Sequence, residues 1–541
     1  MKIAVTIASS LFLCTVTLAQ PGVNWLEYFS QVPGQNEFVA DVEFDDIGNT
    51  YITGRVFQPG ESDNIFTVKI GPDGSEVFRD VYNGTYNGSD EPTGIYVASD
   101  GYLYITGRTQ VDASSFTVVT IKYSPTGTRE WAYTYPFPSL VSAQGNSVVT
   151  DDSGNVYVGG SVEGSGTTSG QDILVLKLDS MGNHLDELLL TQASGQTDDC
   201  YDIALGTDGN IYLTAFSWAS LQDGNEILVM KIDPNLNIFW LQHINGTDNS
   251  LNEFPVDLIL DSANNVYVLA RIQNTGASTD FATVKYNSLG QQQWRTEFNA
   301  AGGQDIPEDM VLDDLGNVYV TGRARLTGYN DFAVVKYNSD GMQQWASYYD
   351  GPEGLDDDPT GIVVDAGGNV YVCGESNRTG SYFEFIVVRY GAGGLFDWEW
   401  VHDVDASSKG YGVSLDASGF LYSAGEGEGP GSDQDFIAVG FNQVLSIGEG
   451  EGSPTTFELS QNYPNPFNPK TEIGYRIPET GKVILTVYDL LGHQVATLVN
   501  GIQDAGKHEV VWNATGVASG VYFYRMASNG LVQTRKLVLL R

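Results

Sequence analysis

The sequence has few basic residues for its length. Its 541 residues include 26 Lys and Arg against 68 Asp and Glu, so the formal net charge is -42. The imbalance belongs to residues 1–456, which hold 18 bases and 62 acids, whereas residues 457–541 hold 8 bases and 6 acids. A surface this acidic repels a phosphate backbone, which argues against nucleic acid as a partner and favours cations or basic protein surfaces.

Cysteine and histidine are also scarce. Of the three cysteines, Cys14 lies in the N-terminal apolar stretch, which leaves Cys200 and Cys373 in the exported chain. These two lie at different positions of the repeat described below, so we expect two buried thiols and no disulfide. The five histidines are scattered, which argues against a histidine-based metal centre or catalytic triad.

The motifs of common catalytic sites are absent. The chain contains no H-E-x-x-H, no G-x-S-x-G and no G-x-x-x-x-G-K-[ST] pattern. The glycines of residues 425–431 stand among glutamates that would repel phosphate, so this stretch is expected to be a loop. These absences favour a protein without catalytic activity. Acids are so numerous, however, that the carboxylate pair of a glycosidase stays open.

Long apolar runs are missing except at the N-terminus. Residues 1–19 combine Lys2, an apolar core and the small-residue cleavage site Thr17-Leu18-Ala19, which predicts a secretory signal peptide. The apolar core is too short for a comfortable membrane span, so we expect no transmembrane segment in the mature chain.

What the sequence does have is a repeat. Residues 313–322, DDLGNVYVTG, have counterparts through the first 450 residues. Their shared tyrosine recurs every 51 to 55 residues, at Tyr51, Tyr104, Tyr157, Tyr212, Tyr267, Tyr319, Tyr371 and Tyr422. Each copy holds four short alternating runs separated by Gly, Asn and Asp turns, which is typical of the four-stranded blade of a β-propeller.

The two ends of this array complete each other. The eighth copy stops after residues 435–441, its third strand, whereas residues 24–28 resemble a fourth strand with no blade before it. We therefore predict an all-β, eight-bladed propeller over residues 20–445, closed by pairing of these two segments.

Residues that recur in every blade are expected to serve the blade. The repeated tyrosines and tryptophans should pack between blades. The repeated bases of the third strand should be solvated or paired with Asp; they are Lys69, Lys122, Lys177, Lys231, Lys285, Lys336 and Arg389. The second-to-third and fourth-to-first connections are longer, varied and partly acidic, and they lie on one face, where binding is predicted.

The densest carboxylates of this long-loop face are Asp356, Asp357 and Asp358. Ca²⁺ favours several oxygen ligands on a flexible loop, so these three residues are candidate Ca²⁺ ligands, although they lack the D-x-[DN]-x-[DN]-G spacing. A solvated acidic loop is the alternative. No other cofactor is expected.

The repeat resembles the SBBP-type β-propeller repeat, with its D-x-x-G-N-x-Y-x-x-G core and following D-F-x-x-x-K-Y strand, over about residues 24–442. Ala215 and Ala270 depart from this pattern by replacing the closing glycine. The resemblance implies a propeller of exported and surface proteins, without a settled activity.

The chain changes character after residues 446–456, a Gly/Glu/Ser/Pro-rich stretch expected to be a flexible linker. Six or seven short alternating runs in residues 457–541 predict a small Ig-like β-sandwich. Four segments resemble the type A C-terminal sorting domain of the bacterial type IX secretion system: YPNPF at 463–467, VYDLLG at 487–492, SGVY at 519–522 and KLVLLR at 536–541. The resemblance implies export by that machinery, often with removal of the tail. A purely structural Ig-like domain is the alternative.

Together these observations predict a secreted or cell-surface, non-catalytic bacterial propeller that binds a protein or a glycan through its long-loop face. Two alternatives stay open. One is an enzyme that acts on extracellular polysaccharide with carboxylates at the mouth of the ring, and the other is a structural component of a surface layer.

Overall fold

The computed structural model describes residues 22–442 and 458–539, except residues 32–34, 58–61, 137–141, 164–169, 191–196, 221–223, 247–252, 275–277, 301–302, 327, 379, 405, 430–433, 460–466, 468, 478–480, 489–492, 504–505 and 529–530. These residues form two compact units within residues 1–446 and 447–541, which are treated separately below. The predicted signal peptide and linker lie outside the described residues.

Within this part of the chain every regular element is a β-strand, in agreement with the all-β prediction. No helix there is long and apolar enough to cross a membrane.

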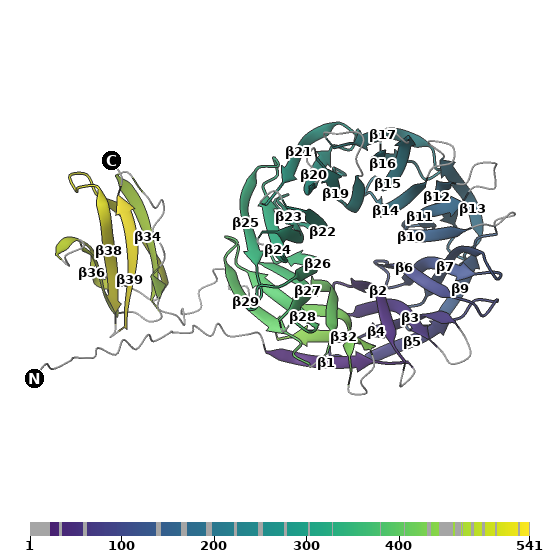
Figure 1. Ribbon diagram of the computed structural model, residues 1–541, viewed down its shortest axis with the longest axis horizontal. Coiled ribbons are helices and arrows are strands. Elements are labelled where there is room, and N and C mark those ends of the chain that lie inside the picture. Colours follow the sequence, from purple (N-terminus) through teal and green to yellow (C-terminus); the bar gives the residue numbers. More distant parts are fainter. Residues whose placement is uncertain are drawn as a thin grey trace, which may run out of the picture. The chain divides into compact units, whose positions relative to one another are not determined.

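The first unit consists of eight four-stranded antiparallel sheets arranged radially in a ring, with the first strand of each sheet nearest the axis (Figure 1). Seven sheets are built from consecutive strands: β2 (Glu37–Phe44), β3 (Thr50–Phe57), β4 (Asp63–Ile70) and β5 (Glu76–Tyr82); β6 (Asp90–Val97), β7 (Leu103–Gln110), β8 (Phe116–Tyr123) and β9 (Arg129–Thr134); β10 (Ala143–Thr150), β11 (Val156–Glu163), β12 (Gln171–Leu178) and β13 (His184–Leu190); β14 (Asp198–Leu205), β15 (Ile211–Ser220), β16 (Gly224–Ile232) and β17 (Ile238–Ile244); β18 (Phe254–Leu260), β19 (Val266–Gln273), β20 (Thr279–Tyr286) and β21 (Gln292–Phe298); β22 (Asp305–Leu312), β23 (Val318–Arg325), β24 (Asn330–Tyr337) and β25 (Gln343–Tyr349); β26 (Asp357–Val364), β27 (Val370–Asn377), β28 (Phe383–Tyr390) and β29 (Phe396–Val401).

The eighth sheet joins the two ends of the array, as predicted. Its strands are β30 (Ser408–Leu415), β31 (Leu421–Glu428), β32 (Gln434–Phe441) and the N-terminal β1 (Val23–Phe29). β1 pairs antiparallel with β32, from Phe29 opposite Phe436 to Val23 opposite Phe441. Ring closure therefore depends on backbone hydrogen bonds between segments about 400 residues apart.

The hydrophobic cores lie between blades. One cluster joins Val149, Ile173 and Val175 of one blade to Ile211 and Leu228 of the next. A blade has two apolar faces, so it must be covered on both sides, and only a closed ring covers every blade.

The tight turn between the first and second strands is held by its leading aspartate. Asp313 accepts hydrogen bonds from the amides of Leu315 and Asn317 (3.0 and 2.9 Å) and from the buried hydroxyl of Tyr319 (3.1 Å). Gly316 has a φ of 74°, which favours glycine. The repeated Asp, Gly and Tyr thus serve one turn.

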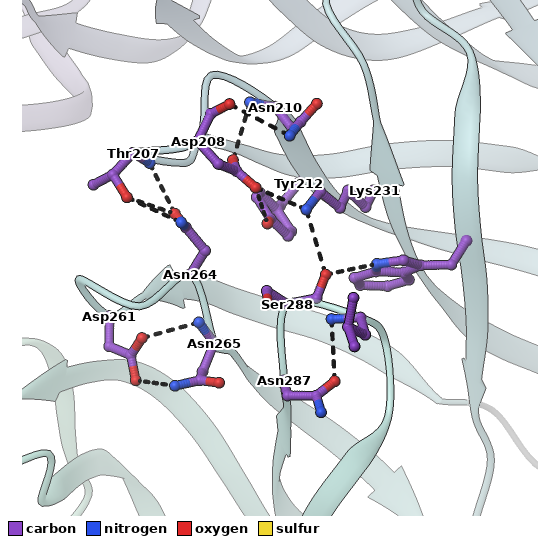
Figure 2. Close-up of polar contacts among 12 residues, drawn as sticks. Thr207, Asp208, Asn210, Tyr212, Lys231, Asp261, Asn264, Asn265, Asn287 and Ser288 are labelled. Atoms are coloured by element: carbon purple, nitrogen blue, oxygen red, sulfur yellow. Dashed lines mark hydrogen bonds and ion pairs between the residues drawn. The ribbon is translucent and has the colours of Figure 1, made fainter.

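The repeated lysines connect blades and are not solvated. Lys69, Lys122 and Lys231 are 7–8% exposed. Lys231 Nζ donates to the carbonyl of Ser288 in the next blade (3.3 Å) and is paired with Asp208 (2.7 Å), as Figure 2 shows. The expectation of solvated or Asp-paired bases is therefore wrong for Lys69 and Lys122, whose ammonium groups donate to the carbonyls of Pro125 and Ser180 in turns of the next blade. For Lys231 the predicted pairing with Asp holds.

The repeated tryptophans bind the same turns. Trp240 Nε1 donates to the carbonyl of Ser288 (3.2 Å) and Trp131 Nε1 to that of Ser180 (3.1 Å). A side chain on Gly290 would collide with the Trp240 ring, so the turn glycine also makes room for the neighbouring blade. Packing between blades is confirmed.

The second unit is built from two sheets. β33 (Glu458–Leu459), β34 (Lys470–Ile477) and β37 (Gly506–Asn513) form one, and β35 (Gly481–Tyr488), β36 (Gln494–Gln503), β38 (Gly520–Ser528) and β39 (Leu531–Leu539) form the other. Ile473 and Trp512 of the first sheet share a core with Leu485, Tyr524 and Leu537 of the second. Two β-sheets therefore pack face to face.

One contact of the closing strand depends on pH. The Tyr28 hydroxyl of β1 lies 2.7 Å from Nε2 of His402 in the preceding blade. His402 is 3% exposed, and burial lowers its pKa to about 4. Because an unfolded histidine takes up a proton near pH 6.5, the stability from neutral His402 is present above that pH and is lost as the pH falls toward 4.

We predict that wild-type protein loses about 2 kcal/mol more stability than a His402→Phe variant between pH 7.5 and pH 4.5. Urea unfolding at the two pH values measures this difference. His184→Phe, which replaces an exposed histidine, should follow the wild type. Equal pH dependence of wild type and His402→Phe would contradict the assignment.

Candidate ligand-binding site

The long-loop face is defined by strand direction. In an antiparallel blade the first and third strands begin, and the second and fourth end, at the same end of the sheet. Connections at the opposite end are tight turns, such as the one that starts at Asp313. The long-loop face therefore contains the residues at which first strands begin and second strands end.

Each first strand carries a β-bulge near that end. Its pairing with the second strand shifts by one residue in every blade, for example between Pro307 and Asp309. The extra residue varies around the ring: Ala40, Thr93, Asn146, Tyr201, Val256, Glu308, Thr360 and Tyr411. Bulges redirect side chains and are frequent near binding sites. This position was not singled out in the sequence, because its residue type is not repeated.

Some bulge residues join neighbouring blades. Thr360 Oγ1 donates to the carbonyl of Gly410 (2.7 Å), and Asn146 Nδ2 donates to that of Cys200 (2.9 Å). Tyr201, Glu308 and Tyr411 carry larger side chains at the same position, and Tyr201 is 47% exposed. These three are the bulge residues best suited to contact a ligand.

An aspartate directly after the bulge fastens one blade to the next. Asp309 accepts from its neighbour Met310 N (2.7 Å) and from Ile362 N of the following blade (2.8 Å). Asp41 does the same with Val42 N and Ile95 N. These residues are half-buried, and the exclusion of solvent around their carboxylates raises the pKa of both to about 7.

A set of charged residues, here called the rim, lies where first strands begin and second strands end. Its members are Arg55, Glu91, Arg108, Arg271, Glu308, Arg323, Asp358, Glu375, Lys409 and Glu426. Arg108 Nη2 lies 2.6 Å from Glu91, Arg323 Nη1 lies 3.1 Å from Asp358, and Lys409 Nζ lies 3.4 Å from Glu375. Five of the 18 bases upstream of residue 457 thus gather at this end of the ring.

Arg271 is the exception within the rim. No acid among the described residues forms an ion pair with it, whereas the other four rim bases each have one. Its guanidinium lies over the Phe254 ring, 4.4 Å from the centroid. Burial lowers the pKa of Arg271, which the nearby Tyr201 and Glu308 partly offset.

Arg271 lines a cavity of about 230 Å³ between three neighbouring blades. The other lining residues are Tyr201, Phe254, Pro255, Val256, Ile306, Pro307 and Glu308. Burial raises the pKa of Glu308, which the nearby Arg323 partly offsets. Aromatic surface, an unpaired arginine and one carboxyl group thus meet in one concave site.

The three predicted Ca²⁺ candidates have different partners. Asp356 Oδ1 accepts from Asn330 N (2.9 Å), and Asp358 is paired with Arg323. Asp357 is fully buried and lies instead with Asp331 and Asp350, one carboxylate oxygen of each within 4.8 Å of the others. Consecutive residues of an extended chain point in alternating directions, which separates the triplet.

The sequence matches two families over parts of its length. The model of the secretion system C-terminal sorting domain matches residues 461–540, and the SBBP beta-propeller repeat matches residues 293–324. No curated protein matches the chain.

Solved structures match at low similarity. Sqt1 from Chaetomium thermophilum is 10% identical with a TM-score of 0.43, over 76% of this chain and 99% of that one. The alpha-L-arabinofuranosidase Arb93A from Fusarium graminearum is 12% identical with a TM-score of 0.37, over 57% and 98%. An endo-arabinase from Bacteroides thetaiotaomicron is 14% identical with a TM-score of 0.27, over 46% and 95%. These similarities are too weak to bear on ligand or activity.

The fold and the family matches define an exported β-propeller protein. More specifically, the chain carries the SBBP β-propeller repeat and a type IX secretion C-terminal sorting domain, which directs it to the cell surface or the extracellular space.

The link between blades made by Asp309 can be tested directly. Asp309→Ala leaves two backbone amides without their acceptor, so the free energy of unfolding at pH 7 should fall by about 2 kcal/mol. Urea unfolding measures the change. Asp340→Ala, which removes an exposed aspartate of the same blade, should change it by less than about 0.5 kcal/mol. Equal effects of the two substitutions would contradict the role of Asp309.

Proposed function

We propose that this protein binds an extracellular glycan that carries carboxylate groups, in the cavity lined by Arg271. The observation that carries the proposal is that Arg271, in a strongly acidic protein, lines this cavity without forming an ion pair with any acid among the described residues. A guanidinium group can bind a carboxylate through two parallel hydrogen bonds, and such pairs are strong when partly withdrawn from water.

The rest of the cavity supports a saccharide. Tyr201 and Phe254 supply aromatic surface for the apolar face of a sugar ring, and Glu308 supplies an acceptor for hydroxyl groups. The blades hold these side chains on β-strands, so the site is rigid before binding and little entropy is lost on ordering it. Export to the cell surface or the extracellular space gives access to such glycans.

A second function rests on Glu308. Because burial raises its pKa, this carboxyl group holds its proton at a higher pH than an exposed glutamate does. A protonated carboxyl beside a bound saccharide is the general acid of glycosidic bond cleavage. Polysaccharide cleavage is therefore the alternative to binding alone.

We predict that Arg271→Gln weakens binding of uronate-containing oligosaccharides at least about tenfold, because it removes the positive charge of the site. Titration calorimetry with acidic oligosaccharides and their neutral counterparts measures the change. Arg295→Gln is the control. Arg295 lies on the fourth strand β21 and is paired with Glu297, so this substitution should leave the affinity unchanged. Unchanged affinity of Arg271→Gln, or a protein as the sole ligand found, would contradict the proposal.

The same oligosaccharides test the alternative. If wild-type protein releases reducing ends from them and Glu308→Gln does not, the site is catalytic. Binding without release of reducing ends supports a binding protein.

A further inference from the structure

Three aspartates converge on the long-loop face between two blades. Asp331 lies at the start of β24, Asp350 directly follows β25, and Asp357 begins β26 of the next blade. One carboxylate oxygen from each lies within 4.8 Å of the others. Asp331 and Asp357 are 2% and 0% exposed, and Asp350 is exposed. Like charges this close and withdrawn from water repel strongly unless something compensates them.

No base provides that compensation. Among the described residues, no Lys or Arg forms an ion pair with Asp331, Asp350 or Asp357. The nearby Arg323 is paired with Asp358 and Glu308 instead. Burial, and to a smaller extent the neighbouring acids, raises the pKa of Asp331 to about 6 and that of Asp357 to about 7.

Two buried oxygens of this site, one of them on Asp357 itself, make no hydrogen bond of good geometry. Asp357 Oδ2 accepts from Gly351 N (2.7 Å), but Asp357 Oδ1 completes no hydrogen bond. Ser376 lies opposite Asp357 on β27, and its hydroxyl is close enough to lower the pKa of Asp357. The Ser376 Oγ nevertheless completes no hydrogen bond of good geometry either. Both residues are fully buried, so these oxygens gain nothing from water.

Both oxygens are directed at the turn that carries Asp350. A Cβ on Gly351 would lie 2.8 Å from Ser376 Oγ and 3.1 Å from Asp357 Oδ1. This turn is closed by a hydrogen bond from Gly354 N to the Gly351 carbonyl (3.0 Å). The unsatisfied oxygens and the three carboxylates therefore belong to one site.

At the preceding blade junction, the carboxylates at the corresponding positions accept hydrogen bonds. There Asp280 precedes Phe281 as Asp331 precedes Phe332, and Asp305 begins β22 as Asp357 begins β26. The place of Asp350 is taken by Asn299, whose Nδ2 donates to Asp280 Oδ1 (2.7 Å).

The carboxylate of Asp305 is satisfied as well, by Ala300 N (2.7 Å) and Arg325 N (3.3 Å). At that junction an amide donor binds one of the two acids, and backbone amides bind the other. Asp350 replaces the amide donor by a third acceptor, which a cation would compensate.

We propose that Asp331, Asp350 and Asp357 bind one Ca²⁺ ion, which ties the end of one blade to the start of the next. An oxygen-only site on a turn suits Ca²⁺, which accepts irregular coordination and takes its remaining ligands from water and backbone carbonyls. Of the consecutive triplet Asp356–Asp358 only Asp357 takes part. None of the three ligands lines the cavity of Arg271, so the two sites can be tested separately.

The test compares Ca²⁺ binding by the full-length wild type, Asp350→Asn and Asn299→Asp. Calorimetric titration should give one Ca²⁺ per wild-type chain, and the melting temperature should rise in Ca²⁺ relative to EDTA. Asp350→Asn recreates the satisfied arrangement of the preceding blade. It should therefore bind at least tenfold more weakly, yet melt in EDTA at the wild-type temperature or above. Asn299→Asp recreates the triple carboxylate there and should bind a second Ca²⁺.

Two results would overturn the proposal. One is a wild-type titration without heat of binding at millimolar Ca²⁺ together with equal melting temperatures in Ca²⁺ and EDTA. The other is a finding that the Asp350→Asn variant binds Ca²⁺ as tightly as the wild type, because the ion would then lie elsewhere. Titration with Mg²⁺ in place of Ca²⁺ distinguishes a specific site from general screening of negative charge.

Discussion

Each blade of this propeller has two apolar faces, and it can bury them only against other blades. The cores accordingly lie between sheets, and the polar groups that enter these interfaces are paired across them. Lys231 and Trp240 donate to one carbonyl of the following blade, and Asp309 accepts an amide from the blade after its own. The same kind of contact recurs at other interfaces, where Trp131 and Asp41 also bond to the following blade, and β1 closes the ring by pairing with β32.

Some departures from the repeat lie at the two proposed sites. Among the bulge residues, Thr360 and Asn146 join blades, whereas Tyr201, Val256 and Glu308 line the cavity of Arg271. Asp350 stands where Asn299 satisfies the preceding blade. Both departures fall on the long-loop face, at the ends of strands that the ring holds in place. In a rigid repeat of this kind, single residues at the strand ends can be replaced at little cost in stability.

Much of the fold could be predicted from the sequence because its signals are local and recur. The period of the tyrosines, the turn residues and the unpaired strand at each end predict the four-stranded sheets and their closure, which the structure contains. The prediction that Cys200 and Cys373 are buried is also confirmed. The prediction that the repeated lysines are solvated or paired with Asp was wrong for Lys69 and Lys122, because their surroundings depend on a turn of another blade.

The sequence by itself determined the blade, its number of copies, the closing strand and the C-terminal sorting domain, since each depends on a contiguous motif or a fixed spacing. Only the tertiary structure decided which side chains meet. The cavity of Arg271 is lined by residues of three blades, and the acidic cluster joins residues 331, 350 and 357 without residues 356 and 358 on either side of 357. The physical reason is strand geometry. Neighbours along an extended chain point apart, whereas strand ends far apart in sequence are brought to the same face of the ring.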